Sequence, residues 1–279
     1  MRAIFLGGDY RQKYACDFLN KQNIQSEYFE NIIFDEKMKK IIGNANIICL
    51  PIPSVKNEIY LNTPCEAPVS IKDIISCSNI DTKFYGAQFT ESIRSCFQLS
   101  NIQFFDYMND ELFQIQNALL TAEGAIHYAK QRIDKSIYGL DTVIFGFGRI
   151  GKILTYLLHS QGARVTVCAR KQSDYAWCQL AGINGVKIKN TNNIYELNLI
   201  NNKYDLIINT IPYWIMQEEF VKNIDSKTKI IDLASFPFGV DELLVKKYNL
   251  NYYRELGIPG RYSPLSAGEI LGNTIINNL

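Results

Sequence analysis

The chain opens with a short apolar run that a helical pattern follows. Ala3 to Leu6 contains no polar residue and stops at the pair Gly7-Gly8. The apolar side chains beyond the glycines recur at helical spacing, at Tyr14, Ala15, Phe18 and Leu19. This pattern predicts a strand, a tight turn and a helix.

Three further short runs predict a parallel sheet in the first part of the chain. They lie near Glu27–Phe29, at Ile47–Pro51 and around Lys83–Ala87, and the segments between them are long enough for crossover helices. We therefore expect residues 1–110 to form a Rossmann-like domain.

A long helical segment without proline follows, over residues 111–135, and its apolar positions fall on more than one face. Such a helix commonly joins two domains, although an ordinary core helix would show the same pattern. We expect an interdomain helix here.

The remaining residues, 136–279, alternate strands with helices. An apolar run at 142–146 leads into a glycine turn, an amphipathic helix and a second strand within about thirty residues, the length of a βαβ unit. Further strands are expected at 205–209, 229–233 and 251–254, and a last helix after Pro264. The fold class is thus α/β, with two Rossmann-like domains that have parallel sheets and are joined by a long interdomain helix.

The glycine turn has the spacing G-x-G-x-x-G, at Gly146, Gly148 and Gly151. In dinucleotide-binding domains the first glycine permits a tight turn, the second lets the backbone approach a pyrophosphate, and the third lets helix and strand pack closely. A glycine turn used only for packing is the alternative. The position between a strand and a helix favours dinucleotide binding.

The end of the next strand indicates which dinucleotide is bound. NAD enzymes usually place Asp or Glu there to bind the ribose 2′-hydroxyl. This chain has Arg170, Lys171 and Ser173 instead, which suit a 2′-phosphate. The two cations could also lie at a solvated strand end. We expect NADP.

Two later loops follow predicted strands at the same sheet edge, 209–212 and 232–235. Ligands bind at that edge in open α/β sheets, so both loops are expected to face the nicotinamide. Alternatively, Pro212 and Pro237 only terminate strands.

The first-domain turn brings Asp9 and Arg11 to the carboxyl edge of its first strand. A guanidinium suits a substrate carboxylate. A salt bridge between Asp9 and Arg11, or a helix cap, is an equally good interpretation.

Composition limits the partners. Lys plus Arg (29) nearly balances Asp plus Glu (28), which argues against nucleic acid and anionic membranes. No signal peptide or membrane span is evident, so we expect a soluble, cytoplasmic protein. The cysteines, seven in number, form no C-x-x-C pair and are expected to be reduced. Neither His127 nor His159 has a second ligand at metal spacing, so no metal is expected.

Several segments together resemble the family of dipicolinate synthase A subunits along nearly the whole chain. They are GGDYRQ at 7–12, NALLTAEGAI at 117–126, VIFGFGRIGK at 143–152, INTIP at 208–212, DLASFPFGVD at 232–241 and GIPGRYSPLSAGEIL at 257–271. The resemblance implies oxidation of dihydrodipicolinate, or of 4-hydroxy-tetrahydrodipicolinate, to pyridine-2,6-dicarboxylate during sporulation. It also implies a partner, a flavoprotein-like B subunit, and leaves open whether the chain forms a homo-oligomer.

The resemblance assigns site residues as well. The small dicarboxylate substrate is expected between the domains, with Glu123 or Asp9 as proton acceptor. Its contacts would be Asp9, Arg11, Asn117, Thr121, Glu123, Ser235 and Arg261. The cofactor would contact Gly146, Phe147, Gly148, Arg149, Ile150, Gly151, Arg170, Lys171, Ser173, Thr210, Ile211, Pro212 and Ala234.

Departures from the family pattern concern the pocket. Tyr10 replaces a small residue, and Phe236 and Phe238 make their loop bulkier. Two alternatives remain: another two-domain NADP dehydrogenase, similar to the methylenetetrahydrofolate or shikimate enzymes, and a non-catalytic NADP-binding redox sensor.

Overall fold

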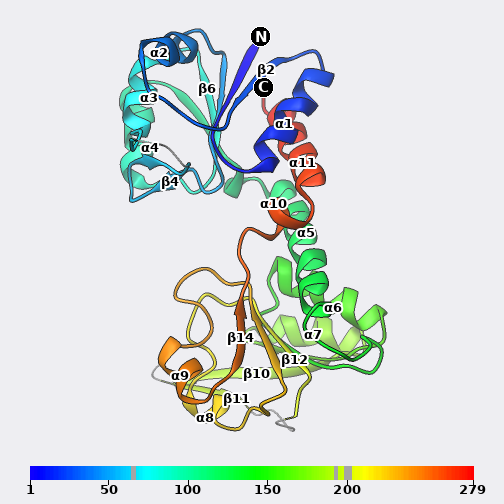
Figure 1. The fold of residues 1–279 in the computed structure, drawn as a ribbon. Coiled ribbons are helices and arrows are strands. Elements are labelled where there is room, and N and C mark those ends of the chain that lie inside the picture. Colours follow the sequence, from blue (N-terminus) through cyan, green and yellow to red (C-terminus); the bar gives the residue numbers. More distant parts are fainter. Residues whose placement is uncertain (64–66, 192–193, 198–202) are drawn as a thin grey trace. The chain divides into compact units, whose positions relative to one another are not determined.

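The structure is a computed structural model that describes residues 1–63, 67–191, 194–197 and 203–279 (Figure 1). The chain divides into two units. Unit 1 comprises Met1–Asn117 and Pro259–Leu279, and unit 2 comprises Ala118–Ile258. Each unit is built around its own sheet.

The sheet of unit 1 has five strands in the order β2-β1-β3-β6-β7, and all neighbours are parallel. Its strands are β1 (Arg2–Leu6), β2 (Gln25–Phe29), β3 (Ile47–Cys49), β6 (Lys83–Gly86) and β7 (Gln103–Asp106). The edge strand β7 was not expected from the sequence. A separate antiparallel hairpin consists of β4 (Val55–Lys56) and β5 (Tyr60–Leu61).

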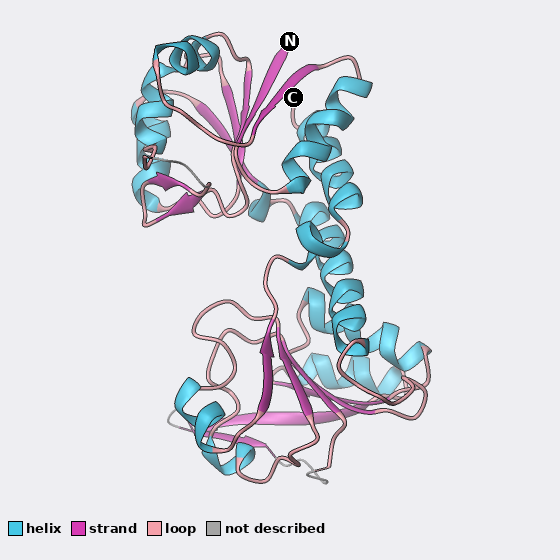
Figure 2. Ribbon diagram, viewed as in Figure 1, coloured by secondary structure: helices cyan, strands magenta, loops and turns pink. Residues whose placement is uncertain are grey.

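Helices cover both faces of this sheet (Figure 2). They are α1 (Tyr10–Lys21), α2 (Glu36–Gly43), α3 (Ile71–Cys77), α4 (Glu91–Leu99), the 3₁₀ turn η1 (Tyr107–Asn109) and α11 (Pro264–Asn277). Ile4 and Leu6 pack in one core with residues of α2, α3 and α4. Ala3 and Phe5 pack in another with α1 and α11. Alternate residues of β1 thus face opposite sides, which is why the strand is apolar throughout.

The last helix belongs to unit 1, which differs from the expected second domain of residues 136–279. Figure 1 shows α11 beside α1, at the opposite end of the chain. The reason is close packing: a Cβ on Gly268 would overlap Tyr14, and one on Gly272 would overlap Phe18. The two helices approach closely because these positions lack side chains.

The expected interdomain helix is α5 (Glu111–Lys130), which ends before residue 135. The boundary between the units falls inside it, after Asn117. Among the described residues, no helix combines the length and apolar character that crossing a membrane requires.

The sheet of unit 2 has seven strands in the order β11-β10-β9-β8-β12-β13-β14. Its strands are β8 (Asp141–Phe145), β9 (Arg164–Ala169), β10 (Asn184–Thr191), β11 (Ile194–Leu197), β12 (Leu206–Asn209), β13 (Lys229–Asp232) and β14 (Asn251–Arg254). Only the pairing of β11 with β10 is antiparallel within this described sheet, so the expected parallel sheet carries one antiparallel edge strand.

The helices of unit 2 beyond α5 are α6 (Arg149–Ser160), α7 (Gln172–Leu180), α8 (Glu218–Val221) and α9 (Glu242–Lys247), and α10 (Ile258–Tyr262) leads back to unit 1. The prediction of an α/β fold with two Rossmann-like halves is confirmed. In both sheets the strand order reverses beside the first strand, between β1 and β3 and between β8 and β12. Ligands of such sheets bind outside the carboxyl ends of the strands at this point.

Candidate functional site

The glycine turn of unit 2 follows β8 at the point where the strand order reverses. Gly146 has φ +99°, a conformation that disfavours other residues, and a Cβ there would overlap Thr210 Oγ1. The amide of Gly146 donates to the carbonyl of Cys168 on β9, over 2.9 Å. The turn is therefore held against both neighbouring strands.

The other two glycines of the motif have different roles. A Cβ on Gly151 would overlap the carbonyl oxygen of Gly146, so this glycine lets α6 start close to the turn. A Cβ on Gly148 would meet nothing within 4 Å. Gly148 is also the N-cap of α6, and no side chain caps this end of the helix. The first amides of α6 thus border open space, which is the arrangement that binds phosphate.

The side chains of the turn differ in exposure. Arg149 is exposed and Ile150 is half-buried. Phe147 is buried, and Lys152 Nζ lies 5.6 Å from the centre of its ring. The side chain of Phe147 therefore packs in the core, and its backbone is the part available to a ligand.

The residues expected at a 2′-phosphate follow β9. Arg170, Lys171 and Ser173 are all exposed. Lys171 is the N-cap of α7, and no side-chain hydrogen bond caps that helix. A carboxylate, Asp174, stands in the first turn of α7 and is half-buried. The structure thus brings two cations, a hydroxyl and a helix N-terminus to one strand end.

The loops after β12 and β13 are tied together by two buried polar residues that sequence reasoning left without a role, Asn209 and Asp232. The amide of Asn209 donates to Asp232 Oδ1 over 2.9 Å, and Asp232 also accepts the backbone amides of Ala234 (3.0 Å) and Gly239 (2.6 Å). The hydroxyl of Tyr252 donates to Asp232 Oδ2 over 2.5 Å. Burial, and then this hydrogen bond, raises the pKa of Tyr252 well above its usual value.

The residues expected along the nicotinamide ribose lie on these loops. The Thr210 hydroxyl donates to the Phe145 carbonyl over 2.8 Å, so it fixes the loop to β8. Ile211 is half-buried and Pro212 is exposed. Ala234 is buried with its amide engaged by Asp232, whereas the next residue, Ser235, is exposed.

The glycine turn of unit 1 is closed by its own side chains. Asp9 caps α1 by accepting the amide of Arg11 over 3.0 Å, and Gln12 Oε1 accepts the amide of Asp9 over 3.1 Å. The guanidinium of Arg11 donates to both carboxylate oxygens of Asp9 and, through Nη2, to the carbonyl of Ile52 over 3.1 Å. Arg11 is 6% exposed. The helix cap and the salt bridge, the two alternatives to substrate binding, are both present.

A pocket of about 560 Å³ opens beside this ion pair. Its lining comprises Asp9, Tyr10, Tyr14, Gly260, Arg261 and Pro264. A Cβ on Gly260 would overlap Asp9 Oδ2, so the glycine lets α10 approach the carboxylate. The structure thereby brings Arg261 to the same pocket as Asp9.

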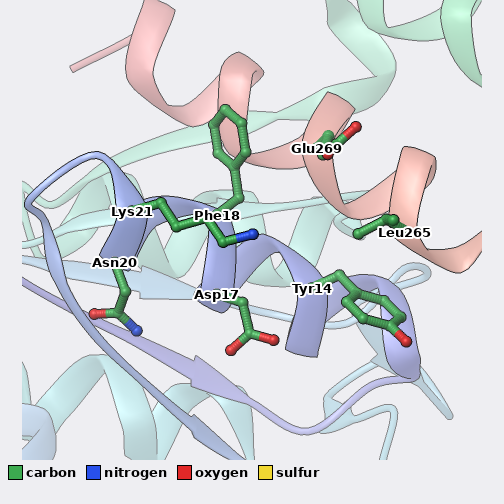
Figure 3. A pocket seen from close by; sticks show the side chains of 7 residues that line it. All are labelled: Tyr14, Asp17, Phe18, Asn20, Lys21, Leu265 and Glu269. Carbon is green, nitrogen blue, oxygen red and sulfur yellow. The ribbon is translucent and has the colours of Figure 1, made fainter.

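A second pocket of unit 1, of about 340 Å³, lies between α1 and α11 (Figure 3). Phe18 extends from α1 toward α11, and Lys21 and Glu269 add charges of both signs. None of the expected site residues lines this pocket.

The remaining expected substrate residues lie on α5. Asn117 is half-buried and is the last residue of the first segment of unit 1. Thr121 is buried and Glu123 is exposed, and both belong to unit 2.

The cysteines that the structure describes all have free thiols. Cys65 lies outside the described residues. Burial raises the pKa of Cys168, on β9, far above its usual value, so this thiol is a core residue.

Known proteins resemble this chain in sequence and in fold. Residues 2–108 match the family model of the N-terminal domain of the dipicolinate synthase A subunit. The A subunit of dipicolinate synthase from Bacillus subtilis (strain 168) is 32% identical over 161 residues, which are 58% of this chain and 52%, about half, of that relative.

Solved structures extend the likeness in fold to the whole chain. The crystal structure of the dipicolinate synthase A subunit from Bacillus halodurans has a TM-score of 0.83 at 23% identity, over 99% of this chain and 97% of that one. The apo structure of D-lactate dehydrogenase from Escherichia coli has a TM-score of 0.62 at 13% identity, over 100% and 96%. The resemblance seen in the sequence is confirmed: the chain is a relative of the A subunit of dipicolinate synthase, and residues 2–108 belong to the family of its N-terminal domain.

Proposed function

We propose that this chain is the A subunit of a dipicolinate synthase, an NADP-dependent oxidoreductase of spore-forming bacteria that works in the mother-cell cytoplasm. The reaction would convert dihydrodipicolinate, or 4-hydroxy-tetrahydrodipicolinate, to pyridine-2,6-dicarboxylate. The observation that carries the proposal is the turn at Gly148, where an uncapped helix N-terminus borders open space. The named relatives supply the substrate class.

The residues of unit 2 fit a dinucleotide. The amides at Gly148, Arg149 and Ile150 would hold the pyrophosphate, and Gly146 and Gly151 shape the turn. Arg170, Lys171 and Ser173 would bind the 2′-phosphate. The loop at Thr210–Pro212 and Ala234 would border the nicotinamide ribose. When bound, the dinucleotide supplies a ring that accepts a hydride.

Aromatisation of the substrate ring makes the reaction favourable, so the chain needs mainly to orient the ring and to remove a proton. We assign the substrate's contacts to Arg11, Asn117, Thr121, Ser235 and Arg261. Arg261 and Asp9 line one pocket in unit 1, which supports their assignment.

Glu123 is the better of the two proton acceptors. Asp9 already accepts the guanidinium and the amide of Arg11, whereas Glu123 is exposed on α5. Glu123→Gln keeps the shape and removes the base, so kcat should fall by roughly 100- to 10,000-fold. The KM for the dicarboxylate should change little. Unimpaired kcat across the pH range would assign Glu123 a structural role.

The partner is proposed from the relatives, each of which is named as the A component of a synthase. A flavoprotein-like B subunit would complete the enzyme. Assays of the chain with and without that partner would show whether it is needed for turnover.

The central experiment follows NADP reduction by the purified chain with dihydrodipicolinate as substrate. Formation of pyridine-2,6-dicarboxylate and NADPH in equal amounts is the expected result. NADP binding without turnover, with the B subunit present, would favour a redox sensor instead. Turnover of a folate or shikimate substrate would point to the other dehydrogenase classes.

A further inference from the structure

Three aromatic side chains stand exposed on the loops that follow β12 and β13. They are Tyr213, 41% exposed, Trp214, 48% exposed, and Phe236, 80% exposed. Large aromatic side chains gain free energy when they are buried, so a cluster of exposed ones marks a surface that binds something. We call these three residues the aromatic platform.

Hydrogen bonds hold the platform in place. Trp214 Nε1 donates to the carbonyl of Pro237 over 3.0 Å, which joins the first loop to the second. The amide of Met216 donates to the carbonyl of Gly239 over 3.0 Å, and Asp232 accepts the amide of Gly239. The ring of Phe236 meets that of Phe238 edge-on, with centroids 6.0 Å apart. A ligand that stacks here would lose little free energy in ordering the loops.

The location narrows the choice of ligand. In a doubly wound sheet the two halves of a dinucleotide lie on opposite sides of the point where the strand order reverses. Arg170 and Lys171 follow β9, on one side of β8, and the platform follows β12 and β13, on the other. A ring that reacts with the cofactor must therefore lie near the platform.

The size of the platform also separates two kinds of occupant. A stable protein interface buries about 800 Å² on each partner, with roughly twenty or more residues. Three aromatic side chains fall far short of that, but they match one face of a planar six-membered ring.

We propose that the aromatic platform, with Phe236 at its most exposed point, binds the flat face of the pyridine-type dicarboxylate ring. This inference rests on the proposed function and deepens it. Phe236 then selects planar rings over puckered ones of similar charge, because only a planar ring makes full contact with its face.

Calorimetric titration of the full chain with pyridine-2,6-dicarboxylate, in the presence of NADP, tests the proposal. Stacking contributes on the order of 1 to 3 kcal/mol per ring, so Phe236→Ala should raise the Kd roughly tenfold or more. Phe236→Tyr should restore binding, and Phe236→Leu should restore it only in part. The Kd for NADP should stay the same in every variant.

Location is read from fluorescence, because the chain has only two tryptophans, Trp177 and Trp214. In a Trp177→Phe background, the dicarboxylate should alter the emission of Trp214. Leu180→Ala is the matched control: Leu180 is 82% exposed in the same unit, at the C-terminal end of α7, and should leave both readouts unchanged.

Three results would overturn the proposal: equal dicarboxylate affinity of Phe236→Ala and the parent, an equal loss of NADP affinity, or a loss only of binding to a B subunit. The last would make the platform a protein interface. Turnover measured on the same preparations separates this inference from the proposed function. Phe236-dependent binding without turnover contradicts the function and supports the platform, whereas turnover with Phe236-independent binding does the opposite.

Discussion

Two glycine turns occupy equivalent places in the two units. Each follows the first strand of its sheet, β1 or β8, and each leads into a helix of 12 residues, α1 or α6. In unit 1, Asp9 caps the helix and Arg11 neutralises the carboxylate. In unit 2, the cap position is Gly148 and no side chain reaches the first amides.

The difference shows how one fold position becomes a binding site in one unit and a structural joint in the other. The N-terminus of a helix has unsatisfied amides and a positive partial charge, so it needs an acceptor or an anion. Unit 1 supplies the anion from its own chain. Unit 2 leaves the place open, and an external phosphate can take it.

The sharpest way to break this contrast is Gly148→Asp, which gives unit 2 the cap of unit 1. Gly148 has φ −77° and open space around it, so the substitution fits the backbone. Like charges about 4 Å apart near a protein surface repel by about 4 kcal/mol, and NADP affinity should fall about a thousandfold. Thermal stability should hold or rise slightly, since Asp is a favoured cap.

Gly148→Ala is the control for this prediction, because it adds bulk at the same position without charge. Its loss of NADP affinity, measured by calorimetry, should be clearly smaller. Undiminished NADP affinity of Gly148→Asp would show that the open turn does not hold the pyrophosphate.

A second change tests whether the charges that face outward in unit 2 read the 2′-phosphate. Charge-assisted hydrogen bonds contribute about 1.5 to 3 kcal/mol each, so replacing Arg170 and Lys171 by Ala should erase a preference for NADP over NAD of about a hundredfold. NAD affinity should change little. Arg164→Ala is the matched control, because Arg164 starts the same strand and pairs with Asp141 over 2.6 Å.

Titrations at two ionic strengths would add to this test. The NADP preference should weaken with salt in the parent and lose that dependence in the double variant. Equal affinity of the unmodified chain for NADP and NAD would contradict the assignment and make both cations part of a solvated strand end.

The smallest expected effect lies in unit 1. Asp9→Ala removes the cap of α1 and leaves the buried guanidinium of Arg11 without its carboxylate, so the free energy of unfolding should fall by about 2 kcal/mol. Urea denaturation followed by circular dichroism measures it. Asp9→Asn, which keeps a capping oxygen, should lose less.

Affinity for NADP should be the same in both Asp9 variants as in the parent, since the turn of unit 1 is closed by its own side chains. A large loss of NADP affinity with unchanged stability would reverse the roles that we assign to the two turns.

Local patterns in the sequence were sufficient for much of the fold and for one half of the site. The strands and helices around Gly146 were predicted because apolar spacing and glycine positions act over a few residues. Strand β7 was missed, since its four residues become a strand through pairing with β6. The spacing of Gly268 and Gly272, one helical turn apart, was the signal that could have revealed the close contact of α11 with α1.

Polar residues at strand ends were the other omission. Asn209 and Asp232 look in the sequence like loop residues near a cofactor, but they are fully buried and bind each other. A carboxylate that organises a loop and one that contacts a ligand have the same local pattern, so only the partners around Asp232 distinguish them.

The sequence by itself determined the α/β architecture and the place of the turn at Gly146–Gly151, because both depend on which residues follow each other along the chain. Only the tertiary structure decided which helix N-terminus is closed. The carboxylate of Asp9 accepts Arg11 while Gly260, from the far end of the chain, packs against it. Such contacts depend on the packing free energy of segments distant in sequence, which local spacing does not record.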